Sequence, residues 1–208
     1  MGNPVQIKVC GMRKPEQITR LQALPLHWIG FIFYPKSPRY VGDNFTCSAG
    51  TNDLKKTGVF VDAPIHWLMQ KIAQVPLDAV QLHGNETTAY CSAIKERNTI
   101  VIKAFAVDEQ FDFNNIEPYI QFTDYFLFDT KTKLKGGSGK KFDWTVLKNY
   151  HLHHPFFLSG GIAPEDVALI KQLKLNNLFA IDINSKFEVS PADKDVDKIK
   201  EFVEDIKD

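Results

Sequence analysis

Short apolar runs recur along the chain, each bounded by glycine, proline, asparagine or aspartate, and this pattern is typical of strands. The runs begin 20 to 30 residues apart, so each interval holds one strand and a crossover of helical length. Most runs are apolar at both alternating sets of positions, as in parallel strands that are covered on both faces. The pattern predicts eight strands, which begin near Gln6, His27, Thr57, Ala79, Thr99, Tyr125, Pro155 and Leu178.

Amphipathic segments between these strands indicate helices. The clearest is 194–206, where apolar residues recur on one helical face and Asp and Lys lie elsewhere. Segments 64–73 and 164–173 show the same pattern after a proline start signal. Helices are also expected at 18–24 and 86–96, with weaker signals at 42–56 and 113–120. Some crossovers should therefore be short or irregular.

Eight consecutive strand and helix units predict an α/β fold, a closed (β/α)8 barrel with a parallel eight-stranded sheet and outer helices. An open doubly wound sheet is less consistent with this count, and no G-x-G-x-x-G motif follows the first strand. No linker or low-complexity tract divides the chain, so residues 1–208 are expected to form a single domain. The chain is shorter than the ~250 residues typical of this barrel, which leaves little room for insertions.

Charge and composition limit the classes of partner and the cellular location that are expected. The 25 Lys and Arg balance 25 Asp and Glu, which argues against a nucleic-acid or membrane-surface partner. No apolar run approaches the ~18 residues of a membrane span and no signal peptide is evident, so a cytoplasmic location is expected. Three widely spaced cysteines disfavour a disulfide scaffold and structural zinc. The carboxylates and histidines are not spaced as a recognisable metal site, so a metal is not expected.

Active sites of this barrel lie at the carboxyl ends of the strands, where the eight loops converge. Cys10 ends the first strand, and it is either a small buried apolar residue or a reactive thiol that serves as nucleophile or general base. Asp129 ends the sixth strand, and it is either a helix N-cap or a site residue. A carboxylic acid and a thiol on one rim indicate paired proton transfers. Cys47 and Cys91 are expected to have no chemical role.

Two turns on the same rim are suited to an anion. Gly160 and Gly161 follow the seventh strand, and Asn184 and Ser185 follow the eighth, where such barrels commonly bind phosphate through backbone N–H groups. The alternative is that the glycines only make a tight turn. The glycine-rich loop 135–140 is interpreted as a mobile cover of the site, or else as a plain flexible loop.

Other polar residues near the rim have weaker signals. Arg39 lies on a proline-bearing loop after the second strand, where it either binds a carboxylate in a bidentate manner or is solvated. His83 is either a residue at the mouth of the barrel or a packed histidine that is hydrogen-bonded to the backbone, and the second alternative is favoured. Asp62 and Asp182 are expected to cap or orient loops.

Several of these motifs together resemble the phosphoribosylanthranilate isomerase family of tryptophan biosynthesis. The resemblance extends from the first strand to the last helix. The residues that carry it are Ile7 to Gly11, Gly30 to Phe33, Lys36 to Arg39, Gly58 to Val61, Val80 to Gly84, Asp129 and Thr130, Gly136 to Gly139, Phe142 to Trp144, Ser159 to Ile162, Asp182 to Ser185 and Glu188.

The resemblance implies an Amadori rearrangement that needs neither cofactor nor metal. N-(5-phosphoribosyl)anthranilate would become 1-(2-carboxyphenylamino)-1-deoxyribulose 5-phosphate. The family's general acid corresponds to Asp129, which protonates the ribose ring oxygen, and its general base to Cys10, which removes the proton from C2. Arg39 would hold the anthranilate carboxylate. Backbone amides at Gly160, Gly161, Asn184 and Ser185 would bind the phosphate.

Some positions depart from the family pattern, and other functions stay open. Met12 to Pro15 replace a threonine-containing stretch, and Lys186 and Ala192 stand where glycine is common. The alternatives are another phosphosugar isomerase or epimerase, and a barrel that binds a phosphorylated ligand without catalysis. Cys10 argues against the related aminoaldose isomerase that uses two aspartates. No obligatory protein partner is expected, and monomers are common in the family.

Overall fold

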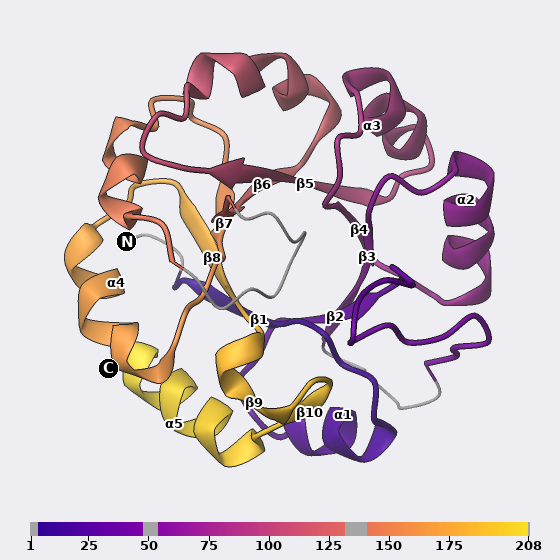
Figure 1. Ribbon diagram of the computed structural model, residues 1–208, viewed down its shortest axis with the longest axis horizontal. Helices are drawn as coiled ribbons and strands as arrows, with labels where there is room; N and C mark the ends of the chain where they lie inside the picture. Colours follow the sequence, from indigo (N-terminus) through magenta and orange to yellow (C-terminus); the bar gives the residue numbers. More distant parts are fainter. Residues whose placement is uncertain (1–3, 48–53, 132–140, 208) are drawn as a thin grey trace.

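The computed structural model describes residues 4–47, 54–131 and 141–207. Within these ranges eight parallel strands close into a barrel in the order of the chain, with β1 hydrogen-bonded to both β2 and β8 (Figure 1). The expected (β/α)8 fold is therefore confirmed. The strands are β1 (Gln6–Val9), β2 (Trp28–Ile32), β3 (Lys55–Phe60), β4 (Ala79–Leu82), β5 (Ile100–Val107), β6 (Tyr125–Thr130), β7 (Phe156–Leu158) and β8 (Leu178–Ile183). Each expected strand lies within two residues of its predicted start.

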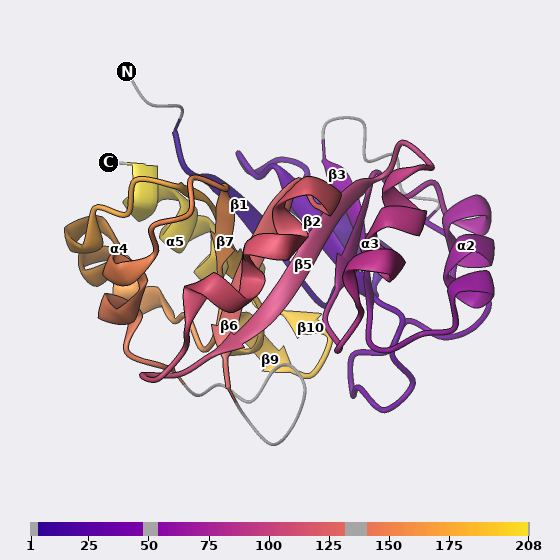
Figure 2. The ribbon, with the colours of Figure 1, turned by 90° about the horizontal axis from the view of Figure 1, so that it is seen from above.

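Helices surround the barrel on the outside, as Figures 1 and 2 show from two directions. The α-helices of the described ranges are α1 (Pro15–Leu21), α2 (Ile65–Gln74), α3 (Thr88–Lys95), α4 (Val167–Leu173) and α5 (Val196–Lys207). Tighter 3-10 helices are η1 (Phe113–Phe122), η2 (Trp144–Asn149), η3 (Pro164–Asp166) and η4 (Ser185–Phe187). None of these helices is long and apolar enough to cross a membrane.

The crossover after β5 is irregular, as the weak helical signal at 113–120 indicated, and it contains the 3-10 helix η1. Pro118 lies inside η1, where its missing N–H and its ring oppose α-helical hydrogen bonding. In the described part of 42–56 no helix forms, and β3 begins at Lys55. That residues 1–208 form one domain stays a prediction.

A two-stranded hairpin after β8 was not predicted from the sequence. It pairs β9 (Glu188–Ser190) with β10 (Asp193–Lys194), two segments too short to show periodicity. Figure 1 shows the hairpin beside α1. Ala192 in its turn has a φ of +64°, in the left-handed region that glycine adopts without strain.

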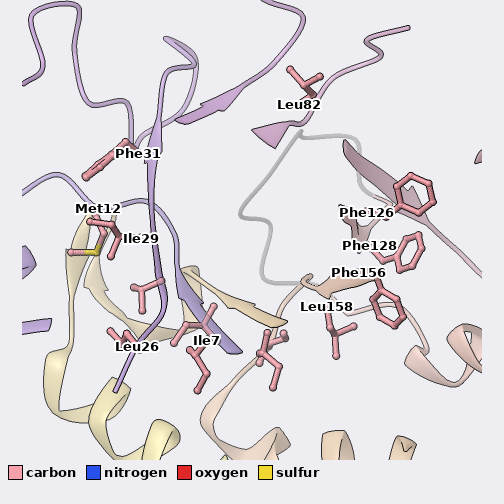
Figure 3. Close-up of a cluster of buried hydrophobic side chains, with 14 of the residues drawn as sticks. Ile7, Met12, Leu26, Ile29, Phe31, Leu82, Phe126, Phe128, Phe156 and Leu158 are labelled. Atoms are coloured by element: carbon pink, nitrogen blue, oxygen red, sulfur yellow. The ribbon is translucent and has the colours of Figure 1, made fainter. Parts of the chain in front are cut away.

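The apolar core lies between the barrel and its helices. Phe126, Phe128 and Phe156 pack together on neighbouring strands, and the rings of Phe128 and Phe156 are 5.0 Å apart (Figure 3). Each fully buried aromatic or aliphatic side chain of this kind stabilises the fold by roughly 1.5–3 kcal/mol. Because the core uses one face of each strand, the other face points into the barrel.

The barrel interior changes from apolar to polar along the strands. A lower cluster contains Trp28, Leu127, Phe157 and Ala180. Side chains two residues further along share the same face, because the side-chain period of a strand is two. This alternation places Lys8 and Cys10, Gln81 and His83, Leu127 and Asp129, and Asp182 and Asn184 in successive interior levels. Polar side chains are thus concentrated towards the carboxyl ends of the strands.

Candidate functional site

A pocket opens where the carboxyl ends of the strands converge, and we call this edge of the barrel the mouth. All the site residues that the sequence singled out contribute to its lining, and His83 and Asp182 line it as well. The tertiary structure thus gathers residues that are as much as 175 positions apart in the chain. The predicted lining residues are Cys10, Arg39, Asp129, Gly160, Gly161, Asn184 and Ser185.

Cys10 follows β1 and its side chain is buried at the base of the pocket. A Cβ at Gly30 on the neighbouring strand would lie 2.8 Å from its Sγ atom, so only glycine leaves room for the thiol there. Burial raises the pKa of the Cys10 thiol, while the ammonium groups of Lys8 and Lys194 oppose this rise. Cys10 therefore lies in the pocket as a thiol whose ionisation the two lysines favour.

Lys8 and Asp182 form a buried ion pair beneath Cys10. The Lys8 Nζ atom is 3.0 Å from Asp182 Oδ1 and donates to Gln81 Oε1 at 2.7 Å. Burial opposes the charge of Lys8, but Asp182 and Cys10 outweigh it and raise the pKa of the ammonium. Burial raises the pKa of the Asp182 carboxyl, and Lys8 opposes that rise. The expectation that Asp182 caps or orients a loop is wrong, because strand alternation turns it into the barrel.

Asp129 ends β6 with both carboxylate oxygens engaged. Oδ1 accepts a hydrogen bond from the backbone N–H of Thr130 at 2.8 Å, and Oδ2 lies 3.1 Å from His83 Nε2. The other ring nitrogen of His83, Nδ1, is 2.8 Å from Gln81 Nε2. The expected backbone hydrogen bond of His83 is therefore wrong, since its ring lies between two side chains in the pocket. The sequence held one signal for this position of His83: it follows Gln81 by two residues, which places both side chains on the interior face of the barrel.

Arg39 is buried beside the pocket, so the solvated alternative is wrong. Its Nε atom is 3.0 Å from both carboxylate oxygens of Glu188, and Nη2 donates to Oε2 at 2.7 Å. Lys194 donates to Glu188 Oε1 and to Asn184 Oδ1, each at 2.7 Å. Burial opposes ionisation of Glu188, but Arg39 and Lys194 outweigh it and lower the pKa of its carboxyl. One carboxylate thus faces two cations, which leaves a net charge of +1.

Lys194 was missed by reasoning from the sequence. It is buried in the hairpin after β8. It carries no motif, and it joins the site through its hydrogen bonds with Asn184 and Glu188 and through its charge near Cys10.

The two turns at the mouth have distinct backbone conformations. Gly160 and Gly161 have φ values of +91° and +69°, in the region that favours glycine. A Cβ at Gly160 would lie 2.7 Å from the backbone nitrogen of Thr130 and 3.0 Å from Asp129 Oδ1. Ser185 begins η4 directly after Asn184. The first turn therefore packs against the Asp129 carboxyl as well as lining the pocket.

Two other expectations concern the loops. Asp62 has a φ of +47°, and its carboxylate accepts a hydrogen bond from the backbone of Asn85, so it orients the loop after β4 as expected. The proposed cover at 135–140 lies outside the described residues. Across the described ranges, no group of three or more His, Cys, Asp or Glu side chains is placed to hold a metal ion.

Comparisons with known proteins agree on one family. The family model described as N-(5'phosphoribosyl)anthranilate (PRA) isomerase matches residues 7–205. An N-(5'-phosphoribosyl)anthranilate isomerase of Parabacteroides distasonis is 45% identical over 204 residues, which cover 96% of this chain and 92% of that protein.

Solved structures give the same result. The crystal structure of phosphoribosyl anthranilate isomerase from Thermotoga maritima superposes with a TM-score of 0.84 at 34% identity, covering 98% of each chain. A crystal structure of a phosphoribosyl anthranilate isomerase in complex with reduced 1-(o-carboxyphenylamino)-1-deoxyribulose 5-phosphate has a TM-score of 0.80 at 31% identity, and the match covers 98% of each chain.

Proposed function

Because the chain belongs to the N-(5'-phosphoribosyl)anthranilate isomerase family, we propose that it catalyses the Amadori rearrangement of N-(5-phosphoribosyl)anthranilate in tryptophan biosynthesis. The product is 1-(2-carboxyphenylamino)-1-deoxyribulose 5-phosphate. One observation carries the proposal beyond family membership: a thiol, Cys10, and a carboxyl, Asp129, line one pocket together with the turns after β7 and β8. Two separate proton-transfer groups are what an aldose to ketose rearrangement needs.

Asp129 acts first, as the general acid. In its protonated form it gives a proton to the ring oxygen of the ribose, and the ring opens to a Schiff base between C1 and the anthranilate nitrogen. The backbone N–H of Thr130 donates to Asp129 Oδ1, and the ring of His83 lies 3.1 Å from Oδ2, which supports a fixed orientation of the acid. Such positioning contributes to catalysis because the acid need not be reoriented in the transition state.

Cys10 acts second, as the general base. Its thiolate removes the proton from C2 of the Schiff base, and the electron pair moves towards the nitrogen to give an enolamine. The enolamine then tautomerises to the ketone. Lys8 supports this role, because its buried ammonium favours the thiolate form of Cys10.

Substrate binding is assigned to the remaining residues at the mouth. Arg39 binds the anthranilate carboxylate through N–H groups that are not engaged by Glu188, since a guanidinium has five donors. The net positive charge of Arg39, Lys194 and Glu188 favours an anion there. Backbone N–H groups at Gly160, Gly161, Asn184 and Ser185 bind the phosphate.

The remaining expectations follow from this reaction. Both steps are proton transfers, so the reaction as written uses neither a metal nor a cofactor. The complex of a relative with the reduced deoxyribulose 5-phosphate compound supports a phosphorylated small molecule as ligand. A place in tryptophan biosynthesis supports a cytoplasmic location. The monomeric state stays a prediction.

The fluorescence decay of phosphoribosylanthranilate tests the proposal. The substrate is generated in place from anthranilate and phosphoribosyl pyrophosphate, and the purified wild type, Cys10→Ala and Asp129→Asn are compared. Decay well above the spontaneous rate is expected only for the wild type. Cys91→Ala is a matched control, because Cys91 is also buried but lies on α3 away from the pocket lining.

The alternatives predict different outcomes. Conversion of aminoaldose phosphates or ribulose phosphate in place of this substrate would identify another isomerase or epimerase on the same barrel. A folded wild type that binds the phosphorylated ligand but converts none of these compounds would contradict an enzymatic role. Decay that survives Cys10→Ala or Asp129→Asn would contradict the role assigned to that residue.

A further inference from the structure

A chain of side-chain hydrogen bonds crosses the barrel interior from β1 to β6. Lys8 Nζ donates to Gln81 Oε1 at 2.7 Å, and Gln81 Nε2 lies 2.8 Å from His83 Nδ1. His83 Nε2 in turn lies 3.1 Å from Asp129 Oδ2. Gln81 is almost completely buried, so bulk water cannot replace these side chains as the hydrogen-bond partners of its amide. The mechanism above uses the two ends of this chain but leaves Gln81 without a role.

The orientation of the Gln81 amide follows from the chemistry of Lys8. An ammonium group has three donors and no acceptor, so only the carbonyl oxygen of an amide can face it favourably. Lys8 is fully buried and ion-paired with Asp182, which keeps its positive charge in the interior. The Oε1 atom of Gln81 must therefore face Lys8, and its NH2 group must face His83.

The orientation of the amide then determines the tautomer of His83. An amide NH2 group only donates, so the Nδ1 atom of His83 must accept and must carry no proton. The ring proton then lies on Nε2 and is donated to Asp129 Oδ2. A doubly protonated ring would place the Nδ1 proton against the NH2 group of Gln81, which is unfavourable.

We propose that Gln81 is a positioning residue, whose amide holds His83 in the Nε2–H tautomer and thereby preserves the proton of Asp129 for the substrate. With the opposite tautomer, the Nε2 lone pair of His83 would face the carboxyl and accept its proton. With the tautomer assigned here, His83 only donates, so the acid can release its proton only towards the pocket. The second part rests on the proposed function, in which Asp129 is the general acid.

Nitrogen NMR of the wild type reads the tautomer directly. Long-range proton–nitrogen spectra of the uniformly labelled protein distinguish Nδ1–H, Nε2–H and doubly protonated imidazole rings. The chain has six histidines, and the signals that vanish in His83→Asn identify the ring of interest. We expect an Nε2–H tautomer for His83. A proton on Nδ1 would overturn the proposal without any need for a variant of Gln81.

Gln81→Glu tests the consequence. A carboxylate of nearly the same shape still accepts from Lys8, but it can only accept from His83, so it draws a proton onto Nδ1. We expect this change in the spectrum, together with a fall in kcat of about 100-fold or more and a small change in KM, because general acid catalysis contributes about 10²–10⁴-fold. Gln172→Glu, at an exposed position on α4, carries the same change of charge as a control.

The spectrum and the turnover separate the two levels of the inference. Unchanged His83 signals and unchanged kcat in Gln81→Glu would overturn the positioning role. A wild type with the expected tautomer but without turnover on phosphoribosylanthranilate would remove the proposed function, and with it the role of Gln81 towards Asp129, while the tautomer assignment would be upheld. A loss of kcat with an unchanged tautomer would also overturn the positioning role, because Gln81 would then affect turnover without determining the tautomer of His83.

Discussion

Replacing Lys8 with methionine removes one partner of an ion pair that lies inside the barrel. Lys8 is fully buried, Asp182 is 5% exposed, and the charged atoms are 3.0 Å apart. At that 3.0 Å separation and an effective dielectric constant of about 20, their attraction is about 5.5 kcal/mol. Removing each ion from water costs several kcal/mol, so the intact pair contributes little net stability. A single buried charge without its partner would keep the cost of leaving water but lose the attraction that offsets it.

Lys8→Met should therefore lower the free energy of unfolding at pH 7 by about 3–5 kcal/mol, the usual cost of leaving one buried charge unpaired. The double variant Lys8→Met/Asp182→Leu should recover most of this loss, because it removes both charges and leaves apolar side chains of similar size. Urea denaturation of the wild type, both single variants and the double variant gives the four free energies of a double-mutant cycle.

The pH dependence provides a second check on the same pair. Without Lys8, the pKa of the folded Asp182 carboxyl should rise further above its value in the unfolded chain. The penalty in Lys8→Met is then present above the folded-state pKa, and it should be relieved as the pH falls towards the unfolded-state value. A loss below about 1 kcal/mol for Lys8→Met, or a double variant as unstable as the sum of the singles, would refute this reasoning.

Three further predictions concern the site. Because burial raises the pKa of Cys10, its rate of alkylation by iodoacetamide should rise about tenfold per pH unit and continue to rise past 9.0, the ordinary pKa of cysteine; a rate that levels off between pH 7 and 9, after subtraction of the rate in Cys10→Ala, would contradict this. Gly160→Ala should lower kcat/KM by about 100-fold by displacing the acid. Gly42→Ala, which has a similar φ of +94° and no atom within 4 Å of the added Cβ, should not, and equal losses would disprove the steric cause. Arg39→Lys keeps the charge but loses the bidentate contact, so KM should rise about tenfold or more with little change in kcat, and an unchanged KM would exclude Arg39 from substrate binding.

The local pattern of the chain determined the fold and the place of the site. Strand runs such as 79–82 and 125–130 are short and apolar on both faces, so their repeat predicts a closed parallel barrel. Because such strands all point the same way, residues that end them must meet at one edge, and Cys10 and Asp129 were predictable for that reason. The hairpin after β8 was not predictable, because segments of two and three residues are too short to show periodicity.

Only the tertiary structure decided which of these residues touch. Lys8 is 73 positions from Gln81 and 174 from Asp182, and no local pattern relates them. Closure of the barrel brings β1 beside β8, and the period of two along each strand turns all three side chains inward. Their hydrogen bonds then depend on burial, which removes water as an alternative partner and leaves each donor to find its acceptor within the protein.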